Sequence, residues 1–209
     1  MQRTYRSVLL CSFLILWAAG SASGKDQTKT FSEIDDLIKG AEDGNDTFQY
    51  YLADAYRAGR LVPQNSEEAL KWYQRAAEQG NLNAQRELAR VYQTGMLPGT
   101  LLKIEKNEKE APFWCRKAAE QGDVDSQCNL GAMIARGTLP DFVQAYKWLD
   151  LCLASPTDRP RITAPMIRDS LAKKMTADQV SEARRLADEW ASGYIQNVGT
   201  GPYNTGWVW

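Results

Sequence analysis

The residue types that could carry catalysis are few in this chain. None of its 209 residues is a histidine, which removes the commonest general base and the commonest metal ligand. Only carboxylate pairs could then supply acid and base groups. Two such pairs, Asp35/Asp36 and Glu67/Glu68, fall in the first turns of predicted helices, where acidic side chains favour the helix dipole. The sequence therefore predicts a protein that is not an enzyme and that uses no cofactor and no metal.

Three of the four cysteines, Cys115, Cys128 and Cys152, lie outside the N-terminal segment. In an oxidising compartment an odd number allows one disulfide and one spare thiol. Cys115 and Cys128 are almost equidistant from a turn predicted at Gly122-Asp123, so they can bond if they face each other. Cys128 with Cys152 is the competing pair, and three free thiols are the third alternative. Three scattered cysteines without histidine do not indicate a metal site.

A repeated sequence carries these residues and determines which elements position them. The segment Ala69–Gly80 recurs almost unchanged as Ala111–Gly122, with an alanine, a tryptophan and a final Glu-Gln-Gly in register. A degraded third copy begins at Ala145. Repeats of this length stack as supersecondary units and enclose no pocket of their own, so the pattern favours binding over catalysis.

A second pattern precedes each copy. Leu52–Gly59, Leu88–Gly95 and Leu130–Gly137 share a leucine, a small residue after it and a closing glycine. This spacing is typical of one helix face. The small residue allows two helix backbones to approach closely, and the glycine suits a helix C-terminus with positive φ. The prediction is one helix pair per repeat, over 46–58 and 66–79, 82–94 and 108–121, and 124–136 and 142–154.

The second helix of each pair begins at a capping signal. Asn65, Asn107 and Asp141 each precede a Glu or Gln by three residues, as a capping box requires. The loop before this helix varies in length, and in the second repeat it adds an apolar stretch within Met96–Lys106. That stretch either packs over the neighbouring repeat or contacts a partner. Its apolar residues are Leu97, Leu101, Leu102 and Ile104.

The segments that flank the repeats differ in composition. Residues 1–24 combine two arginines, an apolar run and a small-residue end, which indicates a secretory signal peptide, with a retained anchor as the alternative. The run of about 12 apolar residues is too short to span a bilayer comfortably. We therefore expect a periplasmic or secreted protein with no integral membrane span after cleavage. The predicted segments are a signal peptide (1–24), an N-terminal capping helix (25–44), three repeats (45–80, 81–122 and 123–154), a C-terminal helical cap (155–192) and an aromatic tail (193–209) that folds back, docks into a partner or is disordered.

At the repeat residues the chain resembles the Sel-one-like repeat (SLR) family, a relative of tetratricopeptide repeats. The matching pattern, over about 40–154, is Leu-Ala/Gly-x-x-Tyr-x-x-Gly followed by Ala-x-x-Trp-Tyr-x-Lys/Arg-Ala-Ala-Glu-Gln-Gly. The resemblance implies an all-α fold, a short right-handed α-solenoid of helix-pair repeats with N- and C-terminal capping helices. It also implies scaffold or adaptor function. A cysteine-rich branch of the family is described as penicillin-binding, but Ala77 and Ala119 stand where that branch has cysteine, so this activity is not transferred.

By analogy with tetratricopeptide arrays, the first helix of each pair lines a concave face. Residues three and four apart lie on the same side of a helix, which selects one stripe of positions. Its arginines suit an acidic or carboxylate-bearing peptide, because Arg pairs bidentately with carboxylates; a solvated helix face is the alternative. The stripe expected to bind a partner comprises Tyr50, Asp54, Arg57, Arg86, Arg90, Gln93 and Arg136, together with Cys128 and Ala132. The recurring Trp72, Trp114 and Trp148 are expected in the core.

The leading functional hypothesis is a non-enzymatic periplasmic or secreted scaffold that binds another envelope or secreted protein through this concave face. A periplasmic regulator of a sensor, a motor or exopolysaccharide assembly is the alternative. A peptidoglycan- or glycan-associated module and an envelope hydrolase are hypotheses of another class. The net charge of −1 argues against a nucleic-acid partner, because nucleic acid requires a basic surface.

Overall fold

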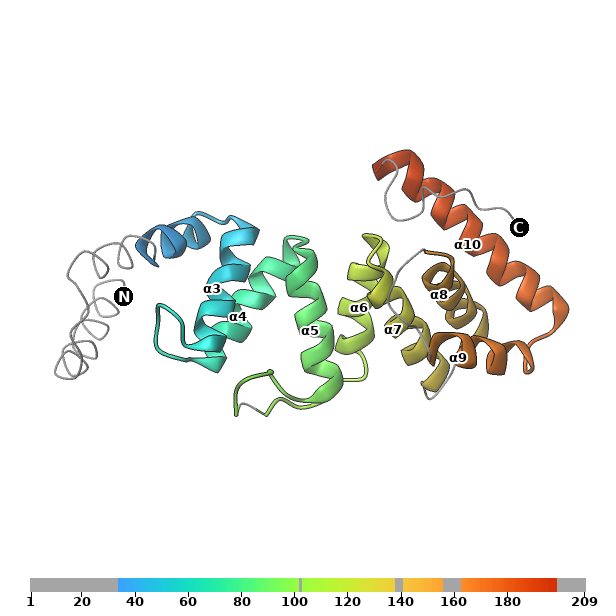
Figure 1. The fold of residues 1–209 in the computed structure, drawn as a ribbon, viewed down its shortest axis with the longest axis horizontal. Coiled ribbons are helices and arrows are strands. Elements are labelled where there is room, and N and C mark those ends of the chain that lie inside the picture. Colours follow the sequence, from blue (N-terminus) through green and yellow to red (C-terminus); the bar gives the residue numbers. More distant parts are fainter. Residues whose placement is uncertain (1–33, 102, 138–140, 156–162, 199–209) are drawn as a thin grey trace.

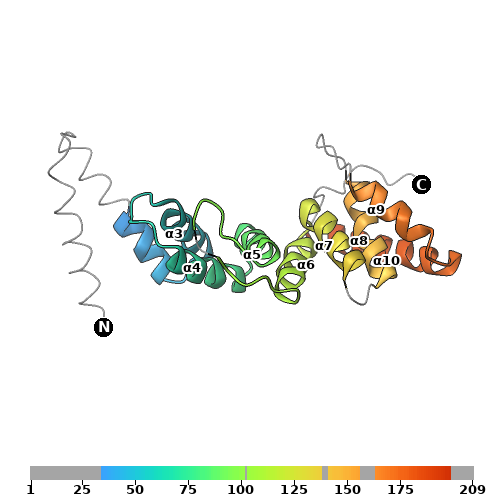
Figure 2. The ribbon, with the colours of Figure 1, turned by 90° about the horizontal axis from the view of Figure 1, so that it is seen from below.

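Three antiparallel helix pairs follow one another along an elongated all-α solenoid (Figures 1 and 2). The computed structural model describes residues 34–101, 103–137, 141–155 and 163–198. We call the first helix of each pair an A helix and the second a B helix. The A helices are α3 (Asp46–Ala58), α5 (Leu82–Thr94) and α7 (Val124–Arg136), and the B helices are α4 (Ser66–Glu78), α6 (Glu110–Glu120) and α8 (Phe142–Ala154). The loops from A to B helices lie at the lower edge in Figure 1, and the turns from B to A helices lie at the upper edge.

At the N-terminus of most of these helices, an asparagine or aspartate side chain accepts hydrogen bonds from backbone N–H groups of the first turn. The caps of this kind are Asn45, Asn65, Asn81, Asp123 and Asp141. Helix α6 differs, because it begins at Glu110 rather than at residue 108 as predicted. Asn107 accepts the backbone N–H groups of Lys109 and Glu110 at 3.0 and 3.1 Å, so it closes a turn that precedes the helix.

The closing glycines of the A helices fall into two classes. Gly59 and Gly95 have φ values of 66° and 75° and end their helices in the left-handed conformation, as predicted. Gly137 has a φ of −62° and is extended, so the prediction was wrong at this position. The third A helix therefore ends without the left-handed turn that the other two share.

Further helices pack on both ends of the array. A helix over residues 34–42 covers the first repeat through Ile34, which packs in a buried apolar cluster with Leu52 and Val62. At the other end, α9 (Thr163–Ala172) and α10 (Ala177–Val198) both contact α8. These helices cover the apolar surface at both ends of the repeat array, and a solenoid needs such caps for solubility.

The last helix is longer than the sequence predicted. Helix α10 continues past residue 192 to Val198, so the first residues of the predicted aromatic tail are helical. The extension has a packing cause: Trp190 contacts Trp148 edge-on at a ring-centroid distance of 5.8 Å and stacks on Tyr194 at 5.1 Å. The Tyr194 hydroxyl donates to the backbone carbonyl of Gln121 at 3.0 Å. The predicted signal peptide (1–24) and the remainder of the tail (199–209) lie outside the described residues.

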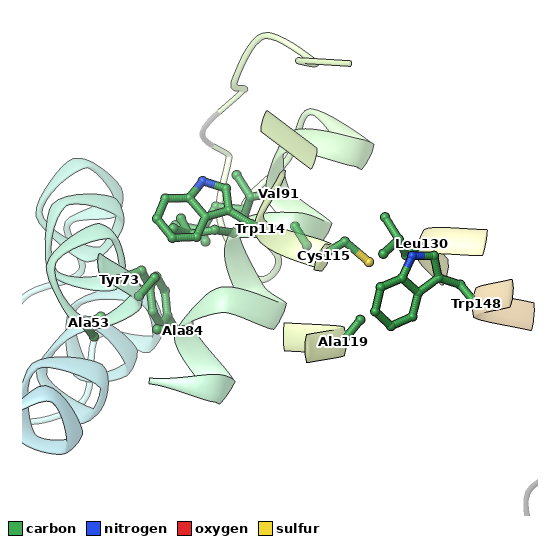
Figure 3. Packing of buried hydrophobic residues seen from close by; sticks show 14 of the residues in the cluster. Ala53, Tyr73, Ala84, Val91, Trp114, Cys115, Ala119, Leu130 and Trp148 are labelled. Atoms are coloured by element: carbon green, nitrogen blue, oxygen red, sulfur yellow. The ribbon is translucent and has the colours of Figure 1, made fainter. Parts of the chain in front are cut away.

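One apolar core runs through all three repeats (Figure 3). Trp114 and Trp148 are buried in it, as predicted, whereas Trp72 is half-buried and carries the Arg75 guanidinium 4.6 Å from its ring centroid. Tyr73 lies at the junction of the first two repeats and is also buried. Burial of these aromatic side chains supplies a large part of the apolar contact between neighbouring helix pairs.

A buried glutamine recurs as the fourth residue of every A helix. Its side-chain amide donates to the carbonyl oxygen of an alanine near the end of the preceding helix. These bonds join Gln49 to Ala41 at 3.1 Å, Gln85 to Ala77 at 3.1 Å and Gln127 to Ala119 at 3.3 Å. The glutamine was not among the residues predicted from the sequence, although its recurrence at one position of each repeat is the signal that marks it.

The glutamine of the recurring Glu-Gln-Gly sequence completes this contact. Gln79 donates its amide to the side-chain oxygen of Gln49 at 2.6 Å, and Gln121 donates to that of Gln85 at 2.8 Å. Gln121 also donates to the carbonyl of Gly80 at 2.8 Å. Through Gln85 and Gln121, hydrogen bonds thus connect α4, α5 and the C-terminal end of α6.

Close backbone approach occurs where the third A helix crosses its partner. A Cβ atom added at Gly131 would lie 2.7 Å from Cγ of Leu149 and 3.0 Å from the carbonyl oxygen of Ala145. The equivalent positions in the first two repeats, Ala53 and Ala89, are also small and buried. The sequence prediction that a small residue permits this approach is confirmed.

We expect Gln85→Ala to lower the free energy of unfolding by about 1–2 kcal/mol, because it removes two hydrogen bonds of a buried side chain, one to the Ala77 carbonyl and one from the Gln121 amide. Gln93→Ala, on the exposed side of the same helix, should change it by less than about 0.5 kcal/mol. Urea unfolding followed by circular dichroism measures both. Equal effects of the two substitutions would contradict the role given to Gln85.

Gly131→Ala should destabilise the protein by about 1–3 kcal/mol through overpacking, although alanine is the better helix former. Gly193 lies in α10 with nothing within 4 Å of an added Cβ, and Gly193→Ala is the matched control. The control should stabilise by about 0.5–1 kcal/mol. Thermal unfolding of both variants gives the comparison, and stabilisation by both would show that α7 and α8 are not in tight contact.

Candidate functional site

The A helices line a groove with a volume of about 610 Å³. Its walls come from α3, α5 and α7, with Cys115 of α6 and the start of α9 completing it. Most of its lining is polar or charged. The polar and charged lining residues are Tyr50, Asn83, Arg86, Glu87, Arg90, Gln93, Asp125, Ser126, Asn129 and Thr163.

The structure brings together only part of the predicted binding stripe. Tyr50, Arg86, Arg90 and Gln93 line the groove, and Cys128 lines it from α7. The other predicted members, Asp54, Arg57, Ala132 and Arg136, are not among its lining residues. All the α5 members of the stripe therefore line the groove, whereas only Tyr50 of the α3 members and Cys128 of the α7 members do.

The two groove arginines already have carboxylate neighbours. Arg86 lies 3.6 Å from Asp123 and 3.7 Å from Asp125, and Arg90 pairs with Glu87 one turn before it. Both arginine side chains are 42% exposed. The groove thus has balanced charge, in contrast to the arginine-rich stripe that the sequence alone predicted.

Arg57 and Asp54 are occupied by contacts within the protein. Arg57 donates to Asp54 at 3.0 Å, to the Tyr73 hydroxyl at 3.2 Å and to the carbonyl oxygen of Pro98 at 3.2 Å. Burial disfavours ionisation of Asp54, but hydrogen bonds from Arg57 and Arg60 outweigh it and lower the pKa of Asp54. These residues anchor the second-repeat loop on the first repeat, which is a structural role.

The structure pairs Cys128 with Cys152 in a disulfide that joins α7 to α8, with a Cα–Cα distance of 5.2 Å. Cys115 is a buried free thiol that donates to the backbone carbonyl of Ser126 at 3.2 Å. Burial and, secondarily, the charge of Asp123 raise the pKa of the Cys115 thiol to about 12. Cys115 therefore stays protonated at neutral pH and is a poor nucleophile.

The described part of the chain contains neither a cluster of metal ligands nor a helix that could span a membrane. Within residues 34–101, 103–137, 141–155 and 163–198, no group of three or more His, Cys, Asp or Glu side chains could hold a metal ion. No helix in the same ranges is both long enough and apolar enough to cross a membrane.

Several groove residues were missed by the sequence prediction. Asn83 lies one turn before Arg86 on α5, so a longer stripe would have included it, and Glu87 lies beside Arg86 and one turn before Arg90, so a wider stripe would have included it. Thr163 and its neighbour on α9 lie outside the repeats and carry no repeat signal. Only the folded arrangement places α9 beside the groove.

Comparison with known proteins identifies the repeats. The Sel1 repeat family model matches residues 47–81, 82–123 and 124–151. The crystal structure of a Sel1 repeat protein from Oxalobacter formigenes is similar, with 27% sequence identity over 66% of this chain and 98% of that chain and a TM-score of 0.56. A second similar structure is c5321, a protective antigen of uropathogenic Escherichia coli strains that displays an SLR fold. It is 29% identical over 80% of this chain and 41% of its own length, with a TM-score of 0.42. No curated protein matches the chain.

The family match agrees with the architecture. The three matched segments together span just over half of the chain, and each contains one of the helix pairs. Sel1 repeats generally mediate protein–protein interactions as scaffolds. The chain belongs to the Sel1 repeat family.

Proposed function

We propose that this protein is an exported, non-enzymatic scaffold whose groove binds a peptide segment of an envelope or secreted protein. The observation that carries the proposal is the groove itself, which spans three A helices and presents Arg86, Arg90 and Gln93 from its centre. Grooves of this kind, formed between stacked helices, are the extended binding surfaces of repeat proteins.

The absence of histidine from the whole sequence supports a non-enzymatic function. The groove thiol, Cys115, is buried and has a raised pKa, so it does not act as a nucleophile at neutral pH. The groove carboxylates, Glu87 and Asp125, both lie against arginines. These features describe a recognition surface and offer no activated group for covalent or acid–base chemistry.

The chemistry of the groove favours a polar segment with carboxylates. Arg86 and Arg90 are half-exposed, and exposed ion pairs stabilise a protein by only about 0–1 kcal/mol. A partner carboxylate can therefore replace an internal one at small cost, with a bidentate geometry that arginine favours. The released Glu87 and Asp125 can accept hydrogen bonds from the partner's backbone or from its basic side chains. Binding should weaken as salt is added.

The proposed location outside the cytoplasm rests on residues 1–24, whose composition is typical of a signal peptide. Expression of the full chain in a Gram-negative bacterium should yield a shortened protein in the periplasmic fraction. The intact mass should correspond to cleavage after Ala22 or Gly24. Recovery of the full-length chain in the membrane fraction would show a retained anchor instead.

Charge reversal in the groove tests the binding proposal. We expect Arg86→Glu combined with Arg90→Glu to reduce capture of the partner at least tenfold, because two attractive contacts become repulsive. The mature protein is cross-linked in its native envelope, purified, and its partners are quantified by mass spectrometry. Helicity should be unchanged by circular dichroism.

Lys71→Glu, on the exposed surface of α4, is the matched control and should leave capture unchanged. Undiminished capture by the groove variant would show that partners do not bind there. Recovery of glycan or peptidoglycan instead of a dominant protein would point to a wall-binding module.

A further inference from the structure

Exposed apolar side chains concentrate on the edge formed by two neighbouring loops. Among the described residues, seven large hydrophobic side chains are exposed, and three of them lie in the A-to-B loops of the first two repeats. Leu61 is 42% exposed, Met96 51% and Leu101 99%. We call these three residues the apolar loop edge. The helices contribute the other four: Phe48 and Tyr51 lie on α3, Phe113 on α6 and Met166 on α9.

Hydrogen bonds hold the two loops against each other. The side-chain amide of Gln64, in the first loop, donates to the carbonyl of Gly99 in the second at 3.1 Å and to that of Arg57 at 2.9 Å. Arg57 donates in turn to the carbonyl of Pro98 at 3.2 Å. Figures 1 and 2 both show the loops side by side at one edge of the array.

Contacts within the second loop, between α5 and α6, also hold it in place. Leu97 is fully buried in the core, and its carbonyl accepts the hydroxyl of Thr100 at 2.8 Å. The backbone N–H of Ile104 donates to the carbonyl of Gly95 at 2.9 Å, and Met96 pairs with Lys103 in an isolated antiparallel bridge. The loop thus places Leu97 inside the core and Leu101 in solvent, and these bonds hold the residues before and after Leu101 in place. Such pre-organisation reduces the entropy lost on binding.

Leu61 shows a second unfavourable feature besides its exposure. Its φ of 66° makes it the only non-glycine residue with positive φ in the described part of the chain. A leucine avoids this conformation because its Cβ crowds the following carbonyl. Backbone strain of this kind is found preferentially at binding sites, where the surrounding structure maintains it for contact.

The surroundings of the edge are basic. Arg60 is 69% exposed at its side chain, and Lys103 and Lys106 are exposed on the second loop, with Glu105 between them. Asp54 pairs with Arg60 and Arg57 and compensates one of their charges. A complementary surface therefore has an apolar centre and carboxylates around it.

We propose that the apolar loop edge is a second protein-binding surface, separate from the groove, which inserts Leu101 into an apolar pocket rimmed by carboxylates on a protein partner. A protein pocket fits better than a lipid surface, because three apolar side chains spread over two loops offer little area for insertion into a membrane. In protein interfaces a few buried side chains carry most of the binding energy, and Leu101 is the most exposed apolar side chain available for that role among the described residues.

Selection from a display library of short random peptides tests the proposal. Peptides are selected on the mature protein and counter-selected on its Leu101→Ser variant, so that only ligands that depend on Leu101 remain. We expect recovered sequences to combine large apolar residues with Asp or Glu. Their affinity, measured by calorimetry on synthetic peptides, should fall at least tenfold with Leu101→Ser and also with Met96→Ser.

Two further variants make the test specific. Met166→Ser, which removes another exposed apolar side chain on α9, should leave affinity unchanged. Leu61→Gly should weaken binding without lowering the melting temperature, because glycine accepts the left-handed conformation. The Arg86/Arg90 reversal should also leave these peptides bound, which separates this surface from the groove.

Three outcomes would overturn the proposal. The first is that no peptide survives counter-selection. The second is that the selected peptides bind the Leu101→Ser variant equally well or lose affinity on the groove reversal. The third is that the protein binds vesicles of phosphatidylglycerol and phosphatidylcholine in a Leu101-dependent manner, which would make the edge a membrane contact.

Discussion

Each junction between repeats depends on a buried side-chain amide that bonds to a helix carbonyl. The amides of Gln49, Gln85 and Gln127 reach back to the preceding helix at the same point in every repeat. A buried amide has a single satisfactory position, because a shift along the helix would leave its N–H donor unpaired in the core at considerable cost. Apolar packing supplies the attraction between neighbouring pairs, and the glutamine fixes their register.

That register decides where the A helices stand and therefore where a groove can form. With the junctions fixed, α3, α5 and α7 present the same face to one side, and their exposed polar residues line a common space. The Cys128–Cys152 disulfide ties the third wall, α7, to α8, and α10 supports the far side of the same pair through Trp190 and Trp148. The groove is thus a consequence of stacking, and the end helices stabilise the repeats that shape it.

The two proposed binding surfaces use different physical interactions. The groove holds paired charges around Arg86 and Arg90, so its selectivity is electrostatic and depends on exchanging one carboxylate for another. The apolar loop edge instead offers Leu101 on a fixed support, where affinity comes from apolar burial with little ordering cost. They lie on different parts of the array, so a scaffold of this size could engage two partners, or two segments of one partner, at once.

The repeat, the helix pairs, the caps Asn65 and Asp141 and the all-α class could be predicted from the sequence, because they follow from local spacing and short-range hydrogen bonds. The sequence also placed Arg86 and Arg90 on the surface that became the groove. The sequence did not show that Arg57 anchors a loop, that Cys128 pairs with Cys152 rather than with Cys115, or that α9 borders the groove. These outcomes depend on which side chains meet across elements distant in the sequence, and local periodicity does not encode that proximity. The length of α10 has the same origin, because Tyr194 continues the helix by packing on a turn 73 residues earlier.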